Sequence, residues 1–194
     1  LAGTLEAVAA TAPEAVAVAL LHAYANGDHE RAIKAVIERL APDLLHCISA
    51  DVLPEISEYQ RTSTTVINAY VMPIVSQYLR QLSARLKAAE IDAPLLLMQS
   101  NGGLINAAVA ERKPANIIES GPAGGAGGAQ ALARKLDLPD IITFDMGGTT
   151  AKASLVEDGE FTRSLDYQVG GGIMIGSRLM SGAGYHLKIP AIDL

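Results

Sequence analysis

The sequence predicts an α/β fold, and three observations lead to that prediction. Apolar runs at residues 16–22 and 44–50 flank a segment with helical spacing, which is the strand–helix–strand pattern of an α/β layer. A longer helical segment follows from about residue 57. From Ile141 the pattern changes to consecutive short strands joined by glycine-containing turns. The 194 residues, 49% of them hydrophobic, suffice for one large domain or two small ones.

Helices and strands alternate in the first part of the chain. Residues 5–12 are expected to be helical up to Pro13, because proline interrupts the helical hydrogen-bond pattern. A turn at residues 26–28 precedes a helix whose apolar positions recur at helical spacing until Pro42. Asp28 suits the N-cap of that helix.

The longest predicted helix begins with the capping-box pattern Ser-Glu-Tyr-Gln at residues 57–60. Its apolar stripe has spacings of three and four and comprises Ile67, Val71, Val75, Leu79, Leu82 and Leu86. Pro73 lies inside this stretch, so we expect a kink or a break there.

A glycine-rich helix is predicted after residue 120. Before it, residues 95–98 read as a buried strand, residues 101–103 as a turn, and residues 117–119 as a short strand. Pro122 suits the first turn of a helix that extends to about Leu136. Each glycine costs such a helix about 1 kcal/mol relative to alanine. Close packing against another backbone, or room for a ligand, must offset that cost.

A boundary between two units is expected at the linker formed by residues 137–140. Three strands follow, at residues 143–146, 151–156 and 161–166. The Asp158-Gly159 pair between the second and third is a strong hairpin signal. The second unit is therefore expected to open with a three-stranded antiparallel meander.

Composition excludes several classes of function. The net charge of −6 argues against nucleic acid and against a membrane surface, because both select basic patches. No apolar run approaches the roughly 20 residues of a membrane span, and residues 1–25 lack the features of a signal peptide. Cys47 is the only cysteine, so no internal disulfide can form, which suits a reducing cytoplasm.

Several common catalytic motifs are missing. No Gly-x-x-x-x-Gly-Lys-Ser/Thr loop is present, and Gln130 stands where a dinucleotide fingerprint starting at Gly125 needs a third glycine. The four histidines show no metal-ligand spacing. Cys47 is best explained as a small core residue, and no serine lies in a nucleophile-elbow sequence.

Two stretches remain as candidate phosphate sites. In the first, an apolar run ends at an acid and a Gly-Gly-Thr-Thr turn, whose members are Asp145, Gly147, Gly148, Thr149 and Thr150. Adjacent glycines leave backbone N–H groups open to an anion, and the acid can hold magnesium through its water shell. The alternative is an ordinary tight turn with a surface aspartate.

The second candidate is the start of the glycine-rich helix, where free N–H groups and the helix dipole favour a phosphate. Its glycines are Gly121, Gly124 and Gly125. Close helix packing through these glycines is the alternative explanation.

Five sequence blocks, in order and over nearly the whole chain, resemble one family. Phe-Asp-Met-Gly-Gly-Thr-Thr at residues 144–150 resembles the second phosphate motif of the actin, sugar-kinase and heat-shock-chaperone ATPases. The blocks at residues 18–26, 58–70, 98–103 and 120–125 are similar to those of the hydantoinase A / 5-oxoprolinase family, with its N-methylhydantoinase and acetone-carboxylase relatives.

The resemblance implies a partial ribonuclease-H-like (actin-like ATPase) fold. Residues 1–139 would form the later part of the first ribonuclease-H-like subdomain with its crossover helix. Residues 140–194 would begin the second subdomain with the phosphate hairpin. The chain starts without methionine and stops soon after a strand-like run, so we expect it to be a central piece of a longer protein. The family's amino-terminal phosphate motif is absent, so this piece alone should bind nucleotide weakly.

The same resemblance implies an ATP-dependent hydrolase that opens a cyclic amide of the hydantoin or 5-oxoproline type. ATP and Mg²⁺ would be the cofactors, with Asp145 as the catalytic and metal-orienting residue and the two glycine groups as phosphate contacts. The rest of the parent chain and a hydantoinase B-like subunit would be its partners. Acetone-carboxylase-type subunits, sugar or carboxylate kinases, and non-catalytic nucleotide-binding regulators remain alternatives.

Lys152 departs from the family pattern. The family commonly places an aspartate at this position, where the present sequence has Thr-Thr-Ala-Lys. A lysine in a strand beside a phosphate turn either neutralises phosphate charge or points to solvent. Its presence leaves the substrate branch open.

Overall fold

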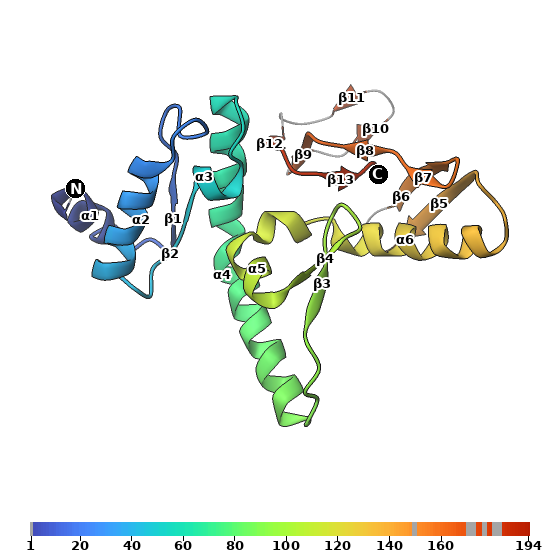
Figure 1. Ribbon diagram of the computed structural model, residues 1–194, viewed down its shortest axis with the longest axis horizontal. Coiled ribbons are helices and arrows are strands. Elements are labelled where there is room, and N and C mark those ends of the chain that lie inside the picture. Colours follow the sequence, from blue (N-terminus) through green and yellow to red (C-terminus); the bar gives the residue numbers. More distant parts are fainter. Residues whose placement is uncertain (1, 149–150, 170–173, 176–177, 180–183) are drawn as a thin grey trace.

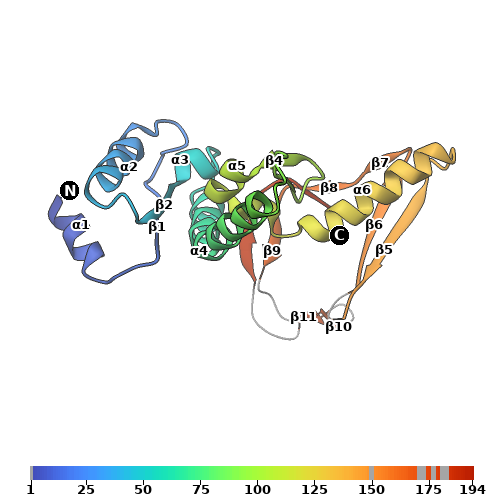
Figure 2. The same ribbon diagram turned by 90° about the horizontal axis from the view of Figure 1, so that it is seen from below.

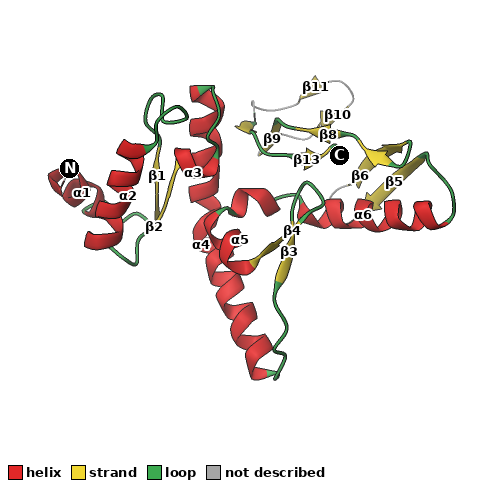
Figure 3. Cartoon of the chain, viewed as in Figure 1, coloured by secondary structure: helices red, strands yellow, loops and turns green. Residues whose placement is uncertain are grey.

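A computed structural model describes residues 2–148, 151–169, 174–175, 178–179 and 184–194. A long central helix, α4 (Glu58–Ala88), separates an amino-terminal α/β layer from the elements that follow it (Figure 1). Figure 2 shows that the glycine-rich helix α6 and a β-hairpin lie at the end of the molecule opposite that layer. Figure 3 distinguishes the helices and strands along the chain.

The helical elements besides α4 are short to medium in length: α1 (Ala2–Ala9), α2 (Asp28–Leu40), α3 (Ser49–Val52), α5 (Ala107–Arg112), the 3-10 helix η1 (Pro114–Ile117) and α6 (Ser120–Lys135). The strands in the first part of the chain are β1 (Ala15–Val18), β2 (Leu45–Ile48), β3 (Leu96–Met98) and β4 (Leu104–Asn106). Those that follow α6 are β5 (Ile141–Met146), β6 (Ala151–Glu157), β7 (Glu160–Phe161), β8 (Arg163–Ser164), β9 (Tyr167–Val169), β10 (Met174–Ile175), β11 (Arg178–Leu179), β12 (Tyr185–Leu187) and β13 (Ala191–Ile192).

The strand–helix–strand prediction for the amino-terminal layer is confirmed, since β1 and β2 pair in parallel and α2 connects them. Both strands are shorter than predicted. β1 ends at Val18 because the backbone of Leu20 binds side chains instead, its N–H donating to Glu30 and its carbonyl accepting from Arg61. β2 ends at Ile48, and α3 follows because Glu30 accepts the N–H of Ala50.

Helix α4 begins where the capping-box pattern predicted, but the capping box itself does not form. Ser57 makes no side-chain cap and has a φ of 105°. The Glu58 carboxylate accepts instead from the N–H of His22 and pairs with Arg61. We expected a kink or a break at Pro73, and the break is wrong, because the 31-residue helix continues through the proline. Met72 and Ser76, which lie on either side of the proline, are both buried, so the helix stays packed on both sides of Pro73.

The core consists of small clusters, two of which use α4. Ile67 of α4 packs with Leu187 and Ile189 near the carboxyl end, and Met72 of α4 packs with Cys47 of β2. Residues more than a hundred positions apart in the sequence therefore pack against the same helix.

The strand predicted at residues 117–119 is wrong. Residues 114–117 form η1, and the polar groups of this backbone are satisfied by side chains rather than by a strand. Asn68 accepts the N–H of Ala115, and the Ser100 hydroxyl donates to the carbonyl of Asn116. β3 pairs antiparallel with β4 instead.

The predicted meander is confirmed in its first part. β5, β6 and β7 form an antiparallel sheet in chain order. Asp158 and Gly159 both have positive φ, 51° and 78°, as a tight primed hairpin turn requires. The predicted third strand splits, however: after β7 the chain crosses to another sheet, where β8 pairs with β13.

The fold class is a mixed α/β fold that corresponds to part of a ribonuclease-H-like (actin-like ATPase) fold. Helix α6 begins within two residues of the predicted Pro122 and ends one residue before Leu136. No helix in the described parts of the chain is both long and apolar enough to cross a membrane.

Candidate functional site

The β5–β6 hairpin places Asp145 directly opposite Lys152 in the antiparallel ladder. Directly opposite residues share one face of a sheet, with Cβ atoms about 4.5–5.5 Å apart. Exposure alternates along β6, where Lys152, Ser154 and Val156 are on the more buried face, and along β5 only up to Phe144. Asp145 is exposed. An acid and a base therefore stand side by side just before the Gly-Gly turn.

The Lys152 ammonium forms an ion pair with Glu119 rather than with Asp145. Glu119 immediately precedes α6, and both side chains of the pair are partly buried, at 25% and 30% exposure. The pair connects the hairpin with the start of α6, which are the two stretches that the sequence singled out as phosphate sites. The structure thus brings the two candidates together.

The backbone of Glu119 is fixed from behind by Ser100. The Ser100 hydroxyl accepts the N–H of Glu119 at 3.4 Å and donates to the carbonyl of Asn116 at 2.9 Å. Tyr167 lies nearby, and its buried hydroxyl makes no hydrogen bond within the described residues. Burial raises the pKa of Tyr167 to about 12, and the Glu119 carboxylate adds to that rise.

The glycines of both stretches leave open space. A Cβ built at Gly147 or Gly148 would meet no described atom within 4 Å, and the same holds for Gly121 and Gly125 of α6. At Gly124 a Cβ would make ordinary contact with Met98 at 3.7 Å. Close packing within the described residues therefore does not explain Gly121 and Gly125. Thr149 and Thr150 lie outside the described residues.

The other end of α6 also holds the hairpin. Gln130 donates to the carbonyl of Gly159 at 2.7 Å, and Arg134 pairs with Glu160 at 2.8 Å. Helix α6 is thus attached to the β5–β6 hairpin near the Gly-Gly turn and again at the β6–β7 turn. This double attachment fixes the distance between the hairpin and the helix start.

A metal ion at this site would depend on few protein ligands. The described residues contain no group of three or more His, Cys, Asp or Glu side chains that could hold a metal. Magnesium, however, usually keeps several waters and binds one or two carboxylates together with substrate phosphates. The exposed carboxylate of Asp145 fits that kind of site.

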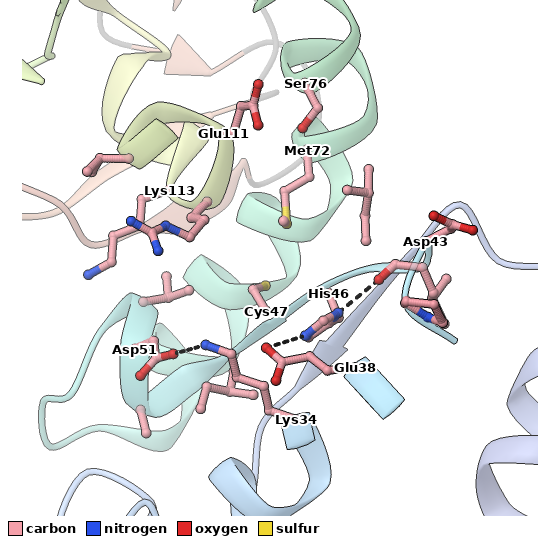
Figure 4. A pocket seen from close by; sticks show the side chains of 18 of the residues that line it. Lys34, Glu38, Asp43, His46, Cys47, Asp51, Met72, Ser76, Glu111 and Lys113 are labelled. Atoms are coloured by element: carbon pink, nitrogen blue, oxygen red, sulfur yellow. Dashed lines mark hydrogen bonds and ion pairs between the residues drawn. The ribbon is translucent and has the colours of Figure 1, made fainter. Parts of the chain in front are cut away.

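A separate hollow of about 780 Å³ lies between α2, β2, α4 and α5 (Figure 4). Lys34 pairs with Asp51 at 2.8 Å on its wall, and His46 lies 3.8 Å from Glu38. Burial raises the pKa of the Cys47 thiol to about 11, so it stays protonated near neutral pH and is a poor nucleophile. The low reactivity of the Cys47 thiol does not favour this hollow as a reaction site.

Sequence reasoning missed a cluster of buried charges at the start of α4. Arg61 and Glu30 are fully buried and lie 3.6 Å apart. The guanidinium of Arg61 also contacts the Ser49 hydroxyl and Glu58. Glu58 and Arg61 have the spacing of an ion pair on a helix, which was a visible signal. Nothing in the sequence placed Glu30 beside them.

Residues 61–194 match the sequence profile of the hydantoinase/oxoprolinase family. This match covers more than half of the chain. The chain belongs to the hydantoinase/oxoprolinase family.

Relatives in this family carry several activities in their names. The chain is 35% identical over 153 residues to caprolactamase subunit alpha of Pseudomonas jessenii, covering 79% of this chain and 22% of that protein. It is 33% identical over 175 residues to 5-oxoprolinase of Saccharomyces cerevisiae, covering 89% and 13%.

Solved structures in the hydantoinase/oxoprolinase family share the fold. A nucleotide-free structure of acetone carboxylase, described with ATP-dependent acetone carboxylation, matches with a TM-score of 0.74 and 28% identity over 95% of this chain and 24% of that one. The ATP-dependent caprolactamase of Pseudomonas jessenii matches with a TM-score of 0.74 and 29% identity over 98% and 26%. The chain thus spans about a quarter or less of the length of these relatives.

Proposed function

We propose that this chain supplies one side of the nucleotide site of an ATP-dependent enzyme that opens a cyclic amide. The observation that carries the proposal is the junction of the Asp145 hairpin with the start of α6 through Lys152 and Glu119. Two glycine stretches with open space and an exposed acid meet there. The likeness to 5-oxoprolinase and to an ATP-dependent caprolactamase supports the reaction class.

Each residue of the site has a role in the proposal. Asp145 would hold Mg²⁺, which would offset the charge of the phosphates, and the open N–H groups after β5 would bind phosphate oxygens. These are the N–H groups of Gly147 and Gly148, and Thr149 and Thr150, which come next in the sequence, are proposed as further donors. Lys152 offsets phosphate charge, and the start of α6, with Gly121, Gly124 and Gly125, lies beside the nucleotide.

ATP makes the amide reactive by transferring its γ-phosphoryl group to the carbonyl oxygen of the ring. A first water then adds to the ring carbon, and the C–N bond opens, with the nitrogen taking a proton, to give an acyl phosphate. A second water hydrolyses the acyl phosphate to phosphate and the ring-opened carboxylic acid. Most of the rate enhancement comes from positioning of the reactants and from stabilisation of charge at the phosphates, because the protein forms no covalent bond in phosphoryl transfer. Asp145 and the glycine N–H groups supply that positioning.

The test is ATP hydrolysis by the full-length protein in the presence of cyclic amides. We expect ADP release to depend on a lactam such as 5-oxoproline, a hydantoin or caprolactam. Asp145→Asn should reduce this rate by about 100-fold or more, since removal of one key electrostatic group costs about that much. Asp158→Asn, an exposed change at the distant β6–β7 turn, serves as the control. Unchanged turnover in the Asp145 variant would refute the site assignment.

Carboxylation of a ketone is the second candidate, because the acetone carboxylase structure matches over 95% of this chain. ADP release that requires bicarbonate and acetone, and no lactam, would favour it. A second subunit, as in the relative named caprolactamase subunit alpha, is part of the proposal in both cases. We also propose a cytoplasmic location, on the basis of the single cysteine.

A further inference from the structure

The Asp145 carboxylate has two candidate partners, a divalent cation and the ammonium group of Lys152. Asp145 stands directly opposite Lys152 in the ladder, and this is the position at which cross-strand acids and bases form ion pairs. A flexible lysine side chain reaches such a neighbour easily. In the structure, however, Lys152 pairs with Glu119, and no described ion pair involves Asp145.

The environment of Glu119 favours its pairing with Lys152. The Glu119 backbone is held by the Ser100 hydroxyl, and its side chain does not cap α6. Its carboxylate is more buried than that of Asp145, which is exposed. An ion pair gains more from a partly buried partner than from an exposed one, because less water screens the charges.

We propose that Glu119 is a positioning residue that draws Lys152 away from Asp145 and so keeps the Asp145 carboxylate available to a divalent cation. Without the Glu119 charge, Lys152 turns to its cross-strand neighbour and occupies the carboxylate. The inference rests on the proposed function, since it assumes that Asp145 binds Mg²⁺ with the nucleotide. It assigns to Glu119 a role that acts only through Lys152.

The test compares three variants of the full-length protein: Glu119→Gln, Lys152→Met and the double variant. Calorimetry at saturating ATP gives the Mg²⁺ concentration at half-maximal nucleotide binding, without reference to turnover. We expect Glu119→Gln to raise this midpoint roughly three- to fivefold, the upper range for a partly exposed ion pair. The double variant should return to the midpoint of Lys152→Met, because no lysine remains to occupy Asp145.

A merely structural role for the pair predicts a different pattern. In that case Glu119→Gln, Lys152→Met and the double variant would shift the midpoint by the same amount. The positioning role instead requires a larger shift in Glu119→Gln than the loss of the Lys152 charge causes in Lys152→Met. Arg134→Met is the matched control, because it breaks the ion pair with Glu160 at the other end of α6. It should lower the melting temperature by less than Glu119→Gln does, because this pair is more exposed, and it should leave the Mg²⁺ midpoint unchanged.

The outcomes separate the two proposals. An unchanged midpoint in Glu119→Gln, or a double variant as impaired as Glu119→Gln, overturns the positioning role while the nucleotide site stands. A wild-type protein that binds no Mg²⁺-ATP overturns both.

Discussion

The fully buried charges of Arg61 and Glu30 connect helices α2 and α4 with the ends of strands β1 and β2. Glu30 of α2 accepts the N–H groups of Leu20 and Ala50, which lie at the ends of β1 and β2. Arg61 of α4 binds the carbonyl of Leu20 from the other side. The ion pair between Glu30 and Arg61 therefore determines where both parallel strands end. It also fixes the position at which α4 packs against the amino-terminal layer.

Arg61→Met should be among the most damaging single substitutions in this chain. It leaves the Glu30 charge buried without its partner, and breaking a buried pair in this way typically costs about 3–5 kcal/mol. Urea unfolding of the full-length protein measures the loss. Arg31→Met removes an exposed pair with Asp28 and should cost less than about 1 kcal/mol. Equal losses in the two variants would contradict the importance of the buried pair.

At the scale of an element, α6 contains more glycine than a stable helix favours. Ala123, Ala126 and Ala133 form its buried side, whereas Gly121, Gly125 and Gly128 are exposed. A Cβ at Gly125 would meet no described atom within 4 Å. Packing among the described residues thus does not offset the cost of this glycine, and a ligand beside the helix remains our proposal.

Gly125→Ala should separate stability from binding. Alanine stabilises a helical position by about 0.5–1 kcal/mol relative to glycine. If the open side of α6 receives the nucleotide, the added methyl group should weaken ATP binding while the melting temperature rises. Gly127→Ala is the control, since a Cβ there also meets no described atom within 4 Å, whereas helix geometry places it about 200° around the axis from Gly125. Tighter or equal ATP binding in Gly125→Ala would argue against the ligand.

At the scale of the whole molecule, one face of the β5–β6 hairpin is not covered by any of the described residues. Ile142, Phe144 and Met146 alternate along β5 and are 74%, 68% and 71% exposed. Their ladder partners Leu155, Ala153 and Ala151 are also exposed and apolar. Three large apolar side chains in a row on one strand form the kind of surface that other protein segments usually cover.

The 194-residue chain expressed by itself should therefore self-associate through this hairpin. Changing Ile142, Phe144 and Met146 together to threonine should lower both dye binding by exposed apolar surface and the apparent mass in sedimentation. The control changes three scattered exposed residues, Ile56, Leu96 and Leu165, to threonine. If both triple variants behave alike, the hairpin face has no special role in association.

Local patterns were enough for much of the fold and for the location of the candidate site. Apolar periodicity predicted the strand–helix–strand layer, the pattern at residues 57–60 and Pro122 predicted the starts of α4 and α6, and the Asp158-Gly159 pair predicted the β6–β7 hairpin. These features depend on interactions between residues close in sequence, such as turn conformations and apolar faces. The paired motifs around Asp145 and Gly121 were visible for the same reason.

Long-range contacts decided the rest. The strand expected at residues 117–119 does not form: residues 114–117 are in η1 and residues 118–119 in a turn. Asn68, almost fifty positions away, supports η1 by accepting the N–H of Ala115. Helix α4 passes through Pro73 because its burial against distant segments outweighs one missing hydrogen bond. Local propensity is worth about 1 kcal/mol or less per ordinary residue, so burial and buried charge override it.

The sequence by itself determined that this chain is an α/β protein with an acid and a Gly-Gly turn at the end of a strand. Only the tertiary structure decided that Lys152 pairs with Glu119 and leaves Asp145 unpaired among the described ion pairs. The physical reason is that two carboxylates, 26 residues apart in the chain, compete for one ammonium group. Which carboxylate pairs with Lys152 depends on burial and on hydrogen bonds to the backbone, and both arise only when α6 packs against the hairpin.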